Sequence, residues 1–251
     1  MEILAFIPAR GGSKGIKKKN MTPLKGQPLL KYTFDAAKKS RLISRVILST
    51  DDEEFAEYGR ENGIEAVMRP KELAGDSTPM KDVIDYHLSE LRNSGYEPDI
   101  LILLQPTSPL RTEKHIDEAL EALINDVEAD ATVSVVDIPH EYLPMKIMEL
   151  NDDGSLRFYR SDGEKYTTRQ ELPHLYARNG AAIYAVYIKS YLKTGSLYGM
   201  RCIPYIMKEE ESVDIDTEFD LFIAECIMKR GISKRDPSGK SPQDDNGVTQ
   251  G

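Results

Sequence analysis

Basic residues and glycines are interleaved near the start of the chain. No acidic residue occurs from Ile3 to Phe34. The basic residues in that window are Arg10, Lys14, Lys17, Lys18, Lys19, Lys25 and Lys31. Gly11, Gly12 and Gly15 lie among the first of them, and a glycine-rich turn can aim backbone N–H groups at an anion while cations neutralise its charge. The pattern indicates a polyphosphate site, and a solvated basic loop is the alternative.

The spacing separates this stretch from two familiar phosphate-binding motifs. A P-loop reads GxxxxGK followed by Ser or Thr, and the chain does not contain it. The glycines follow GGxxG instead of the dinucleotide fingerprint GxGxxG, and residues 10–19 carry five positive charges. That is more charge than a pyrophosphate diester needs, so the pattern favours a triphosphate.

A polar, proline-rich segment follows the most apolar run of the sequence. Residues 100–104 read ILILL and residues 105–111 read QPTSPLR. In open α/β sheets, ligands bind outside the carboxyl ends of the strands, so this segment is expected to present side chains to a ligand. The alternative is a rigid turn that caps the next helix.

Two aspartates alternate in the segment Asp214-Ile215-Asp216. If this segment is a strand, both carboxylates point to the same side, because side chains alternate with period two. Paired carboxylates suit Mg²⁺, which takes one or two protein oxygens together with substrate phosphates. Residues 209–220 hold seven acids, so a solvated acidic stretch is one alternative. A cap for the following helix, made by Asp216 and Thr217, is another.

Composition excludes several classes of protein. The 251 residues carry 33 Lys and Arg against 42 Asp and Glu, a net charge of −9, which argues against a nucleic-acid binder. The two cysteines, Cys202 and Cys226, indicate neither a disulfide framework nor a zinc ribbon, and the four histidines are scattered. The apolar stretch at the N-terminus is too short for a signal peptide or a membrane span, so we expect a cytoplasmic protein with no membrane partner.

Short apolar runs alternate with helical patterns along the first half of the chain. Runs bounded by turn residues predict buried strands. These strands are Ile3–Ile7, Arg45–Ser49, Glu65–Met68, Ile100–Leu104 and Ala131–Val136. Such alternation predicts an α/β fold, with a mostly parallel sheet covered by helices on both faces.

Three amphipathic stripes predict helices. One runs with helical spacing from Ile116 to Val127. A weaker stripe covers residues 83–91, and Thr78 is expected to be its N-cap with Pro79 at the first helical position. A final helix is predicted over residues 219–227.

The pattern changes from about residue 137 to residue 210. A turn signal at residues 151–154 (NDDG) is flanked by short alternating segments, which predicts an inserted antiparallel lobe. Residues 231–251 have no apolar periodicity and are predicted to be a disordered tail. The expected organisation is one domain over residues 1–230 that contains the lobe.

Five blocks of sequence together resemble the N-acylneuraminate cytidylyltransferases. Residues 9–20 read ARGGSKGIKKKN and match the opening motif ARxxSKGxxxKN. The other blocks are RPKELAGD (69–76), LQPTSPLR (104–111), NG (179–180) and DIDT (214–217). The similarity runs in order over about residues 2–229, and it implies a Rossmann-like nucleotidyltransferase sheet with the lobe as a dimer contact.

The resemblance implies that CTP and a nine-carbon 2-keto-3-deoxy sugar acid react to give a CMP-sugar and pyrophosphate. It implies that the triphosphate is held by Arg10, Ser13, Lys14 and Lys19, and that Mg²⁺ is bound by Asp214 and Asp216. The catalytic set is then Arg10, Lys14, Lys19, Asp214 and Asp216. The remaining nucleotide-binding residues are Gly11, Gly12, Asn20, Arg69, Asp76 and Thr78.

The resemblance also implies a sugar site and a homodimer in which the lobe completes the partner's site. The implied sugar-binding residues are Gln105, Lys146, Arg169, Arg178 and Asn179. The family often reads RxNG here, whereas this chain reads ARNG, and AAIY follows in place of AIY. Sialic, legionaminic and pseudaminic acids therefore all remain candidates. A nucleotide-sugar-dependent glycosyltransferase and a non-catalytic nucleotide-binding protein are the alternative functions.

Overall fold

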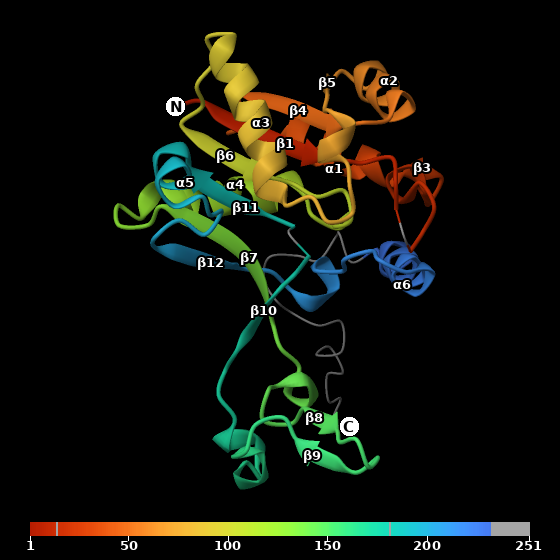
Figure 1. Cartoon of the computed structure of the whole chain (residues 1–251), viewed down its shortest axis with the longest axis vertical. Coiled ribbons are helices and arrows are strands. Elements are labelled where there is room, and N and C mark those ends of the chain that lie inside the picture. Colours follow the sequence, from red (N-terminus) through yellow and green to blue (C-terminus); the bar gives the residue numbers. More distant parts are fainter. Residues whose placement is uncertain (14, 181, 232–251) are drawn as a thin grey trace, which may run out of the picture.

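The predicted apolar runs are the strands of one α/β sheet in a computed structural model, which describes residues 1–13, 15–180 and 182–231 (Figure 1). All the strands are β1 (Ile3–Pro8), β2 (Pro23–Leu24), β3 (Gln27–Pro28), β4 (Arg45–Thr50), β5 (Glu65–Met68), β6 (Ile100–Leu103), β7 (Ala131–Asp137), β8 (Met148–Leu150), β9 (Leu156–Phe158), β10 (Tyr176–Arg178), β11 (Tyr184–Tyr187) and β12 (Cys202–Ile206). Two short hairpins, β2–β3 and β8–β9, lie outside this sheet. The α-helices are α1 (Leu29–Lys39), α2 (Glu53–Glu61), α3 (Met80–Asn93), α4 (Glu113–Asn125), α5 (Ile188–Thr194) and α6 (Glu218–Lys229). The 3-10 helices are η1 (Lys19–Met21), η2 (Lys71–Leu73), η3 (His140–Tyr142), η4 (Gly163–Lys165), η5 (Arg169–Glu171) and η6 (Glu209–Glu211).

The strands β5, β4, β1 and β6 lie side by side and run parallel. Next to β6 comes β11, which is antiparallel to both β6 and β7. One edge of β7 pairs with β11 and then β10, and its other edge pairs with β12. The prediction of a mostly parallel sheet is confirmed. Because β1, β4, β5 and β6 share one direction, their carboxyl ends meet at one edge.

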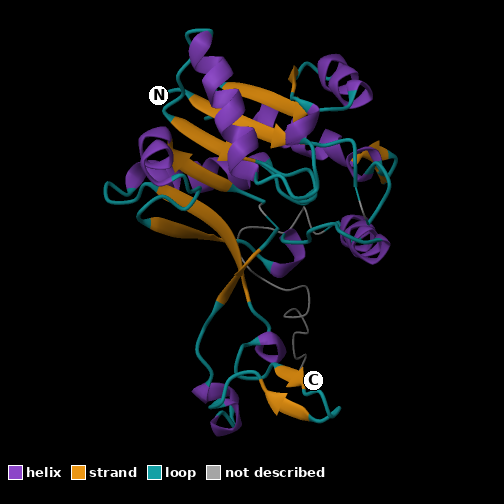
Figure 2. Ribbon diagram, in the orientation of Figure 1, coloured by secondary structure: helices purple, strands orange, loops and turns teal. Residues whose placement is uncertain are grey.

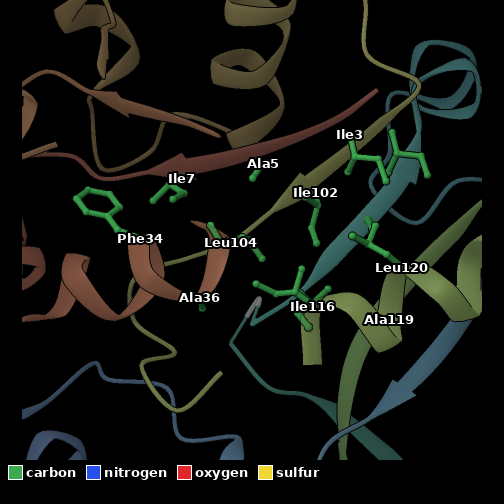
Figure 3. Close-up of a cluster of buried hydrophobic side chains, with 14 of the residues drawn as sticks. Ile3, Ala5, Ile7, Phe34, Ala36, Ile102, Leu104, Ile116, Ala119 and Leu120 are labelled. Carbon is green, nitrogen blue, oxygen red and sulfur yellow. The ribbon is translucent and has the colours of Figure 1, made fainter. Parts of the chain in front are cut away.

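Helices cover both faces of the sheet, as predicted. On one face, Phe34 of α1 and Leu120 of α4 lie in one buried apolar cluster with Ile7 and Ile102 of the sheet (Figure 3). Phe55 of α2 belongs to the same cluster. On the other face, α3 and α5 pack on the alternate residues of the same strands. The central strands are buried on both sides, which is why their sequences are continuous apolar runs.

Two helix boundaries differ from the prediction. Helix α3 begins at Met80 with Pro79 as its N-cap, so the prediction that Thr78 caps it was wrong. The Thr78 hydroxyl instead donates a hydrogen bond to the backbone carbonyl of Glu72. Helix α4 ends at Asn125, and Val127 is 97% exposed, although its spacing continues the apolar stripe.

A lobe projects from the body between β7 and β10 (Figure 2). The predicted turn at residues 151–154 joins β8 and β9 as an antiparallel hairpin, in which Gly154 has φ 82°. The projecting segment covers residues 138–175, a shorter range than the predicted 137–210. Residues 176–206 return to the main sheet as β10, β11 and β12, because their apolar side chains join its core.

Helix α6 packs beside the β2–β3 hairpin through a small third cluster that includes Leu24, Leu29 and Ile215. The described residues form no helix with the length and apolar character needed to cross a membrane. Of the predicted tail, residues 232–251 lie outside the described residues, as do Lys14 and Ala181.

Candidate active site

A cavity of about 360 Å³ opens at the carboxyl ends of β1, β5 and β6. Its walls come from segments far apart in the sequence: the basic loop, the turns after β5 and β6, and the acidic segment before α6. The predicted site residues that line it are Arg10, Ser13, Lys19, Asn20, Arg69, Asp76, Thr78, Gln105 and Asp216. Gly11 and Gly12 lie in the same loop but outside the lining.

Backbone contacts fix the basic loop against the sheet edge. The backbone amide of Gly11 donates to the Asp51 carboxylate at 3.1 Å, and the side-chain Nδ2 of Asn20 donates to the backbone carbonyl of Arg10 at 3.3 Å. A β-carbon added at Gly15 would collide with the backbone carbonyl oxygen of Asp216. Glycine at this position therefore lets the basic loop and the acidic segment approach each other closely.

Each cation of the cavity lies beside a carboxylate. Arg10 pairs with Asp76 at 2.5 Å, and Lys19 pairs with Asp216 at 2.7 Å. These ion pairs bring residues of the basic loop into contact with two distant segments. An incoming polyphosphate can take the place of the carboxylates, because its oxygens offer the same charge-assisted hydrogen bonds.

Arg69 is the most buried cation of the cavity. Its side chain lies 3.7 Å from Asp51, and its Nε atom has no hydrogen-bond partner among the described residues. Burial lowers the pKa of Arg69, Asp51 opposes that change, and Arg10 adds to it. A buried guanidinium with an unused N–H is a ready donor for an acceptor atom of a ligand.

A buried histidine, His87, lies close enough to Arg69 to feel its charge. The His87 ring lies 2.7 Å from the Ser49 hydroxyl and packs against Phe6. Burial, together with the nearby Arg69 charge, lowers the pKa of His87 to about 4. The apolar stripe of α3 predicted that this residue lies on the buried face, but no sequence signal indicated its contact with Ser49.

The turn after β6 is held by Arg111, whose role the sequence did not reveal. Its guanidinium is buried and donates to the carbonyls of Gln105 at 3.1 Å and Ala182 at 2.8 Å, and to the Thr33 hydroxyl at 2.6 Å. Burial lowers the pKa of Arg111 to about 9. The partners are mostly backbone carbonyls, which every residue has, so no sequence pattern marks them.

The acidic segment is not a strand. Residues 212–215 have no regular structure, so the prediction that the two carboxylates alternate along a strand was wrong. The amide of Ile215 donates to the Thr107 carbonyl at 2.8 Å, which joins the segment to the turn after β6. Thr217, with Asp220, forms the capping box of α6, so the alternative of a helix cap holds for Thr217. The Asp216 side chain pairs with Lys19 instead.

The two aspartates lie in different surroundings. Asp216 exposes 72% of its side chain, whereas Asp214 is mostly buried and its Oδ1 atom has no partner among the described residues. Burial raises the pKa of Asp214, Asp216 adds to the rise, and the nearby Thr107 hydroxyl and Lys19 oppose it. A second charge close to an unsatisfied carboxylate oxygen fits a divalent cation, which would satisfy both carboxylates.

Among residues 1–13, 15–180 and 182–231, no three or more His, Cys, Asp or Glu side chains gather as a metal site. Asp214 and Asp216 by themselves could supply only part of a coordination shell. Mg²⁺ accepts such a partial shell, because it usually retains waters and binds substrate phosphates. The pair fits a cation that arrives with a nucleotide.

Four predicted sugar-binding residues lie away from this cavity. Lys146 and Arg169 line a cavity of about 280 Å³ in the lobe. Arg178, on β10, donates to the Tyr198 hydroxyl at 3.0 Å. Asn179 is 97% buried, and its amide is occupied by hydrogen bonds within the chain. Of the predicted sugar-binding set, Gln105 lines the main cavity.

Residues 4–228 match the family model described as "Cytidylyltransferase". The chain belongs to this family. Its family membership agrees with the resemblance drawn from the five sequence blocks. The matched range includes residues 138–175, which form the lobe.

This cytidylyltransferase-family chain is similar to several curated proteins. It is 36% identical over 230 residues to the N-acylneuraminate cytidylyltransferase of Escherichia coli O18:K1:H7, an alignment that covers 91% of this chain and 52% of that protein. Over 234 residues it is 31% identical to the CMP-N,N'-diacetyllegionaminic acid synthase of Legionella pneumophila, covering 91% and 97%. The chain thus spans about half the length of the N-acylneuraminate cytidylyltransferase of E. coli.

A solved structure shares the fold. The structure of CMP:2-keto-3-deoxy-manno-octonic acid synthetase complexed with CTP aligns with a TM-score of 0.68 at 17% identity, covering 92% of this chain and 100% of that one. At this level of identity the likeness concerns the arrangement of strands and helices. It supports the fold of this family member independently of its sequence motifs.

Proposed function

We propose that this chain catalyses transfer of CMP from CTP to a nine-carbon 2-keto-3-deoxy sugar acid, with release of pyrophosphate. One observation carries the proposal: Arg10, Lys19 and Arg69 meet an acidic segment in a single cavity at the carboxyl ends of the parallel strands. That combination suits a nucleoside triphosphate bound with a divalent cation. The names of the relatives support cytidine as the base and a nonulosonic acid as the acceptor.

The triphosphate is bound by exchange of ion-pair partners. Arg10 leaves Asp76 and Lys19 leaves Asp216, and both cations then bind phosphate oxygens. The exchange keeps each cation paired before and after binding, which limits the cost of taking charge out of water. Ser13 and Asn20, which also line the cavity, donate further hydrogen bonds to the triphosphate.

Asp216, once released from Lys19, joins Asp214 in holding Mg²⁺. Asp214 and Asp216 would hold the ion, which would supply positive charge against the phosphates of the bound nucleotide. Burial of Asp214 keeps water from competing for its carboxylate. The chain's own task is to hold both carboxylates beside the basic loop, and the contact between Gly15 and the Asp216 carbonyl does this.

The reaction forms a bond between the anomeric oxygen of the sugar acid and the α-phosphorus of CTP, and breaks the bond from that phosphorus to the pyrophosphate oxygen. The proton of the attacking hydroxyl goes to solvent water or to a carboxylate of the acidic segment. Negative charge then develops on the leaving pyrophosphate. Arg10 and Lys19 stabilise this charge, because they are fixed in place before the reaction. Gln105 lies at the cavity edge, where its amide can bind the incoming sugar acid.

We infer that a second copy of the chain completes the sugar site. Lys146 and Arg169 line the small cavity of the lobe and not the cavity of the body. The lobe projects away from the body (Figure 1). The lobe also exposes large apolar side chains, a feature of surfaces that bind a partner. These side chains are Tyr142, Ile147, Met148, Leu150, Leu156 and Tyr159. A homodimer that buries them would bring two cations to the partner's sugar carboxylate.

A cytoplasmic location stays a prediction from the sequence.

Pyrophosphate release tests the reaction. The purified chain is supplied with Mg²⁺, with CTP, UTP, ATP or GTP, and with a panel of eight- and nine-carbon keto-acid sugars. We expect release with CTP and one nine-carbon acid. Binding of CTP without release from any pair would contradict the proposal and would favour a glycosyltransferase or a binding protein.

A further inference from the structure

We propose that Asn179 and Gly180 are positioning residues, which fix the Asp214 carboxylate for metal binding, and that Asn179 does not bind the sugar. The inference rests on the proposed function for the role of Asp214. It differs from the role in sugar binding that sequence resemblance implies for Asn179.

The side chain of Asn179 is fully engaged inside the chain. Its Oδ1 atom accepts a hydrogen bond from the Ser134 hydroxyl at 2.6 Å. Its Nδ2 group donates to Ser212 Oγ at 3.0 Å and to Met207 Sδ at 3.2 Å. Both amide hydrogens and the amide oxygen are thus used, and only 3% of the residue is exposed. A sugar hydroxyl would have to displace one of these partners.

These hydrogen bonds connect the main sheet to the acidic segment. Ser134 lies in β7, and its hydroxyl also accepts a hydrogen bond from the Ile183 amide at 2.9 Å. Ser212, the other partner, precedes Asp214 by two residues. Asn179 therefore bridges a rigid strand and a segment that has no regular structure of its own.

Gly180 makes the second contact, directly with the carboxyl group. Its backbone has φ 65°, and an added β-carbon would overlap Asp214 Cγ and Oδ2. The lack of a side chain at position 180 thus allows the Asp214 carboxyl to pack on the backbone. On its other side the segment is held by the hydrogen bond from Ile215 to Thr107.

Asp214 needs such support because Oδ1 has no hydrogen-bond partner among the described residues. Packing on Gly180, together with the nearby Thr107 hydroxyl, therefore orients the carboxyl group until a cation binds. Residues that orient a metal ligand commonly change metal affinity by about 10- to 100-fold when they are replaced.

Binding of Mn²⁺, measured by electron paramagnetic resonance in the presence of CTP and without sugar acid, tests the inference. We expect Asn179→Ala to weaken Mn²⁺ binding by about tenfold or more, and Gly180→Ala to weaken it at least as much. The KM for the sugar acid, measured at saturating metal, should stay within about twofold.

Ser212→Ala provides a milder variant in case the first two do not fold. It removes the link nearest Asp214, and we expect a smaller loss of Mn²⁺ affinity in the same direction. Thr132→Val is the matched control, because Thr132 is buried in β7 and its hydroxyl has no partner among the described residues. That variant should bind Mn²⁺ as the unsubstituted protein does.

A raised KM for the sugar acid with unchanged Mn²⁺ binding in Asn179→Ala would overturn the inference and assign Asn179 to the sugar site. Absence of Mn²⁺ binding by the unsubstituted protein would overturn it together with the metal role of Asp214. The transferase activity is tested separately, by pyrophosphate release from the unsubstituted protein.

Discussion

The cavity of the body and the lobe were both predicted to bind substrate, but they are built in different ways. Cavity residues from four distant segments meet because parallel strands end at one edge of the sheet. The lobe is a local excursion of residues 138–175, with one short hairpin and several 3-10 turns (Figure 2). Its two candidate cations, Lys146 and Arg169, share a small cavity of their own.

The difference indicates where each half of the site is completed. Within one chain, the body brings together cationic side chains, acidic side chains and most of the residues predicted to bind the nucleotide. The lobe brings its cations to a surface with exposed apolar side chains, which suits contact with another chain. We therefore expect the nucleotide half of the site to form within one chain and the sugar half to form across a dimer interface.

The largest effect is expected in the body. Lys19→Ala should lower turnover by about 10²- to 10³-fold, because it removes one preorganised cation from the triphosphate. Pyrophosphate release at saturating CTP measures it. Lys18→Ala is the matched control, since Lys18 pairs with Glu54 and does not line the cavity. Equal effects of the two variants would remove Lys19 from the site.

Coexpression of two inactive variants tests the lobe. Lys19→Ala damages the body and Arg169→Ala damages the lobe, and each alone should have little activity. If the lobe serves the partner's cavity, half of the dimers are mixed and each mixed dimer has one intact site, which restores about a quarter of the sites. No restoration would show that each lobe serves its own chain.

The buried histidine of the body, His87, should make the stability of the protein depend on pH. The pKa of His87 is about 4 in the folded protein and about 6.5 when unfolded. Between these values the unfolded chain binds a proton that the folded protein does not. The free energy of unfolding should therefore fall by up to about 3 kcal/mol as the pH drops from 6.5 to 4.

Urea unfolding at several pH values, compared with His87→Gln, isolates this contribution. Glutamine does not titrate and can still form a hydrogen bond with Ser49. Between pH 6.5 and 4, the free energy of unfolding of the variant should therefore fall by about 3 kcal/mol less than that of the unsubstituted protein. His174→Gln is the lobe control, because 73% of that side chain is exposed. Parallel curves for the unsubstituted protein and His87→Gln would contradict the buried, uncharged state.

Two glycines of the basic loop sharpen the description of the body. Gly15→Ala should cost about 1–3 kcal/mol of stability, because the new methyl group collides with the Asp216 carbonyl. Gly12→Ala should change stability by less than about 0.5 kcal/mol, since nothing lies within 4 Å of an added β-carbon. Urea unfolding of both variants decides, and equal losses would show that Gly15 does not hold the acidic segment.

The smallest effect is expected beyond both regions. Truncation after Arg230 should leave turnover and melting temperature nearly unchanged, because the family match ends at residue 228 and the removed residues are mostly polar. Calorimetry and pyrophosphate release measure both properties. A fall of several degrees in the melting temperature would show that the tail contributes to the fold.

Much of the body could be predicted from local sequence. The apolar runs at β1, β4, β5, β6 and β7 are long enough to identify buried strands, since a sheet covered on both faces needs apolar side chains on both sides. Loops that follow such strands lie at the ligand edge. For this reason the basic loop and Gln105 were found as site candidates from the residues alone, whereas Arg69 was named only through the family resemblance.

The boundaries of elements with weak patterns were predicted less well. Val127 has the spacing of the apolar stripe, but the helix ends before it, because Asp126 accepts hydrogen bonds from the amides that follow. Asp214 and Asp216 alternate as strand residues do, yet no neighbouring strand pairs with them. The periodicity of a sequence indicates which face a segment could bury. Only the tertiary packing decides whether another helix or strand covers that face.

Residue types and their spacing alone predicted a basic, glycine-rich loop suited to a triphosphate, a pair of aspartates and an α/β sheet. The tertiary structure decided which of these meet: Lys19 contacts Asp216 across 197 residues, and Asn179 bonds to Ser134 and Ser212. Local patterns cannot specify such pairs, because an amide, a carbonyl or a glycine has the same chemistry wherever it occurs. Its partner follows from the strand order and from the register of the sheet.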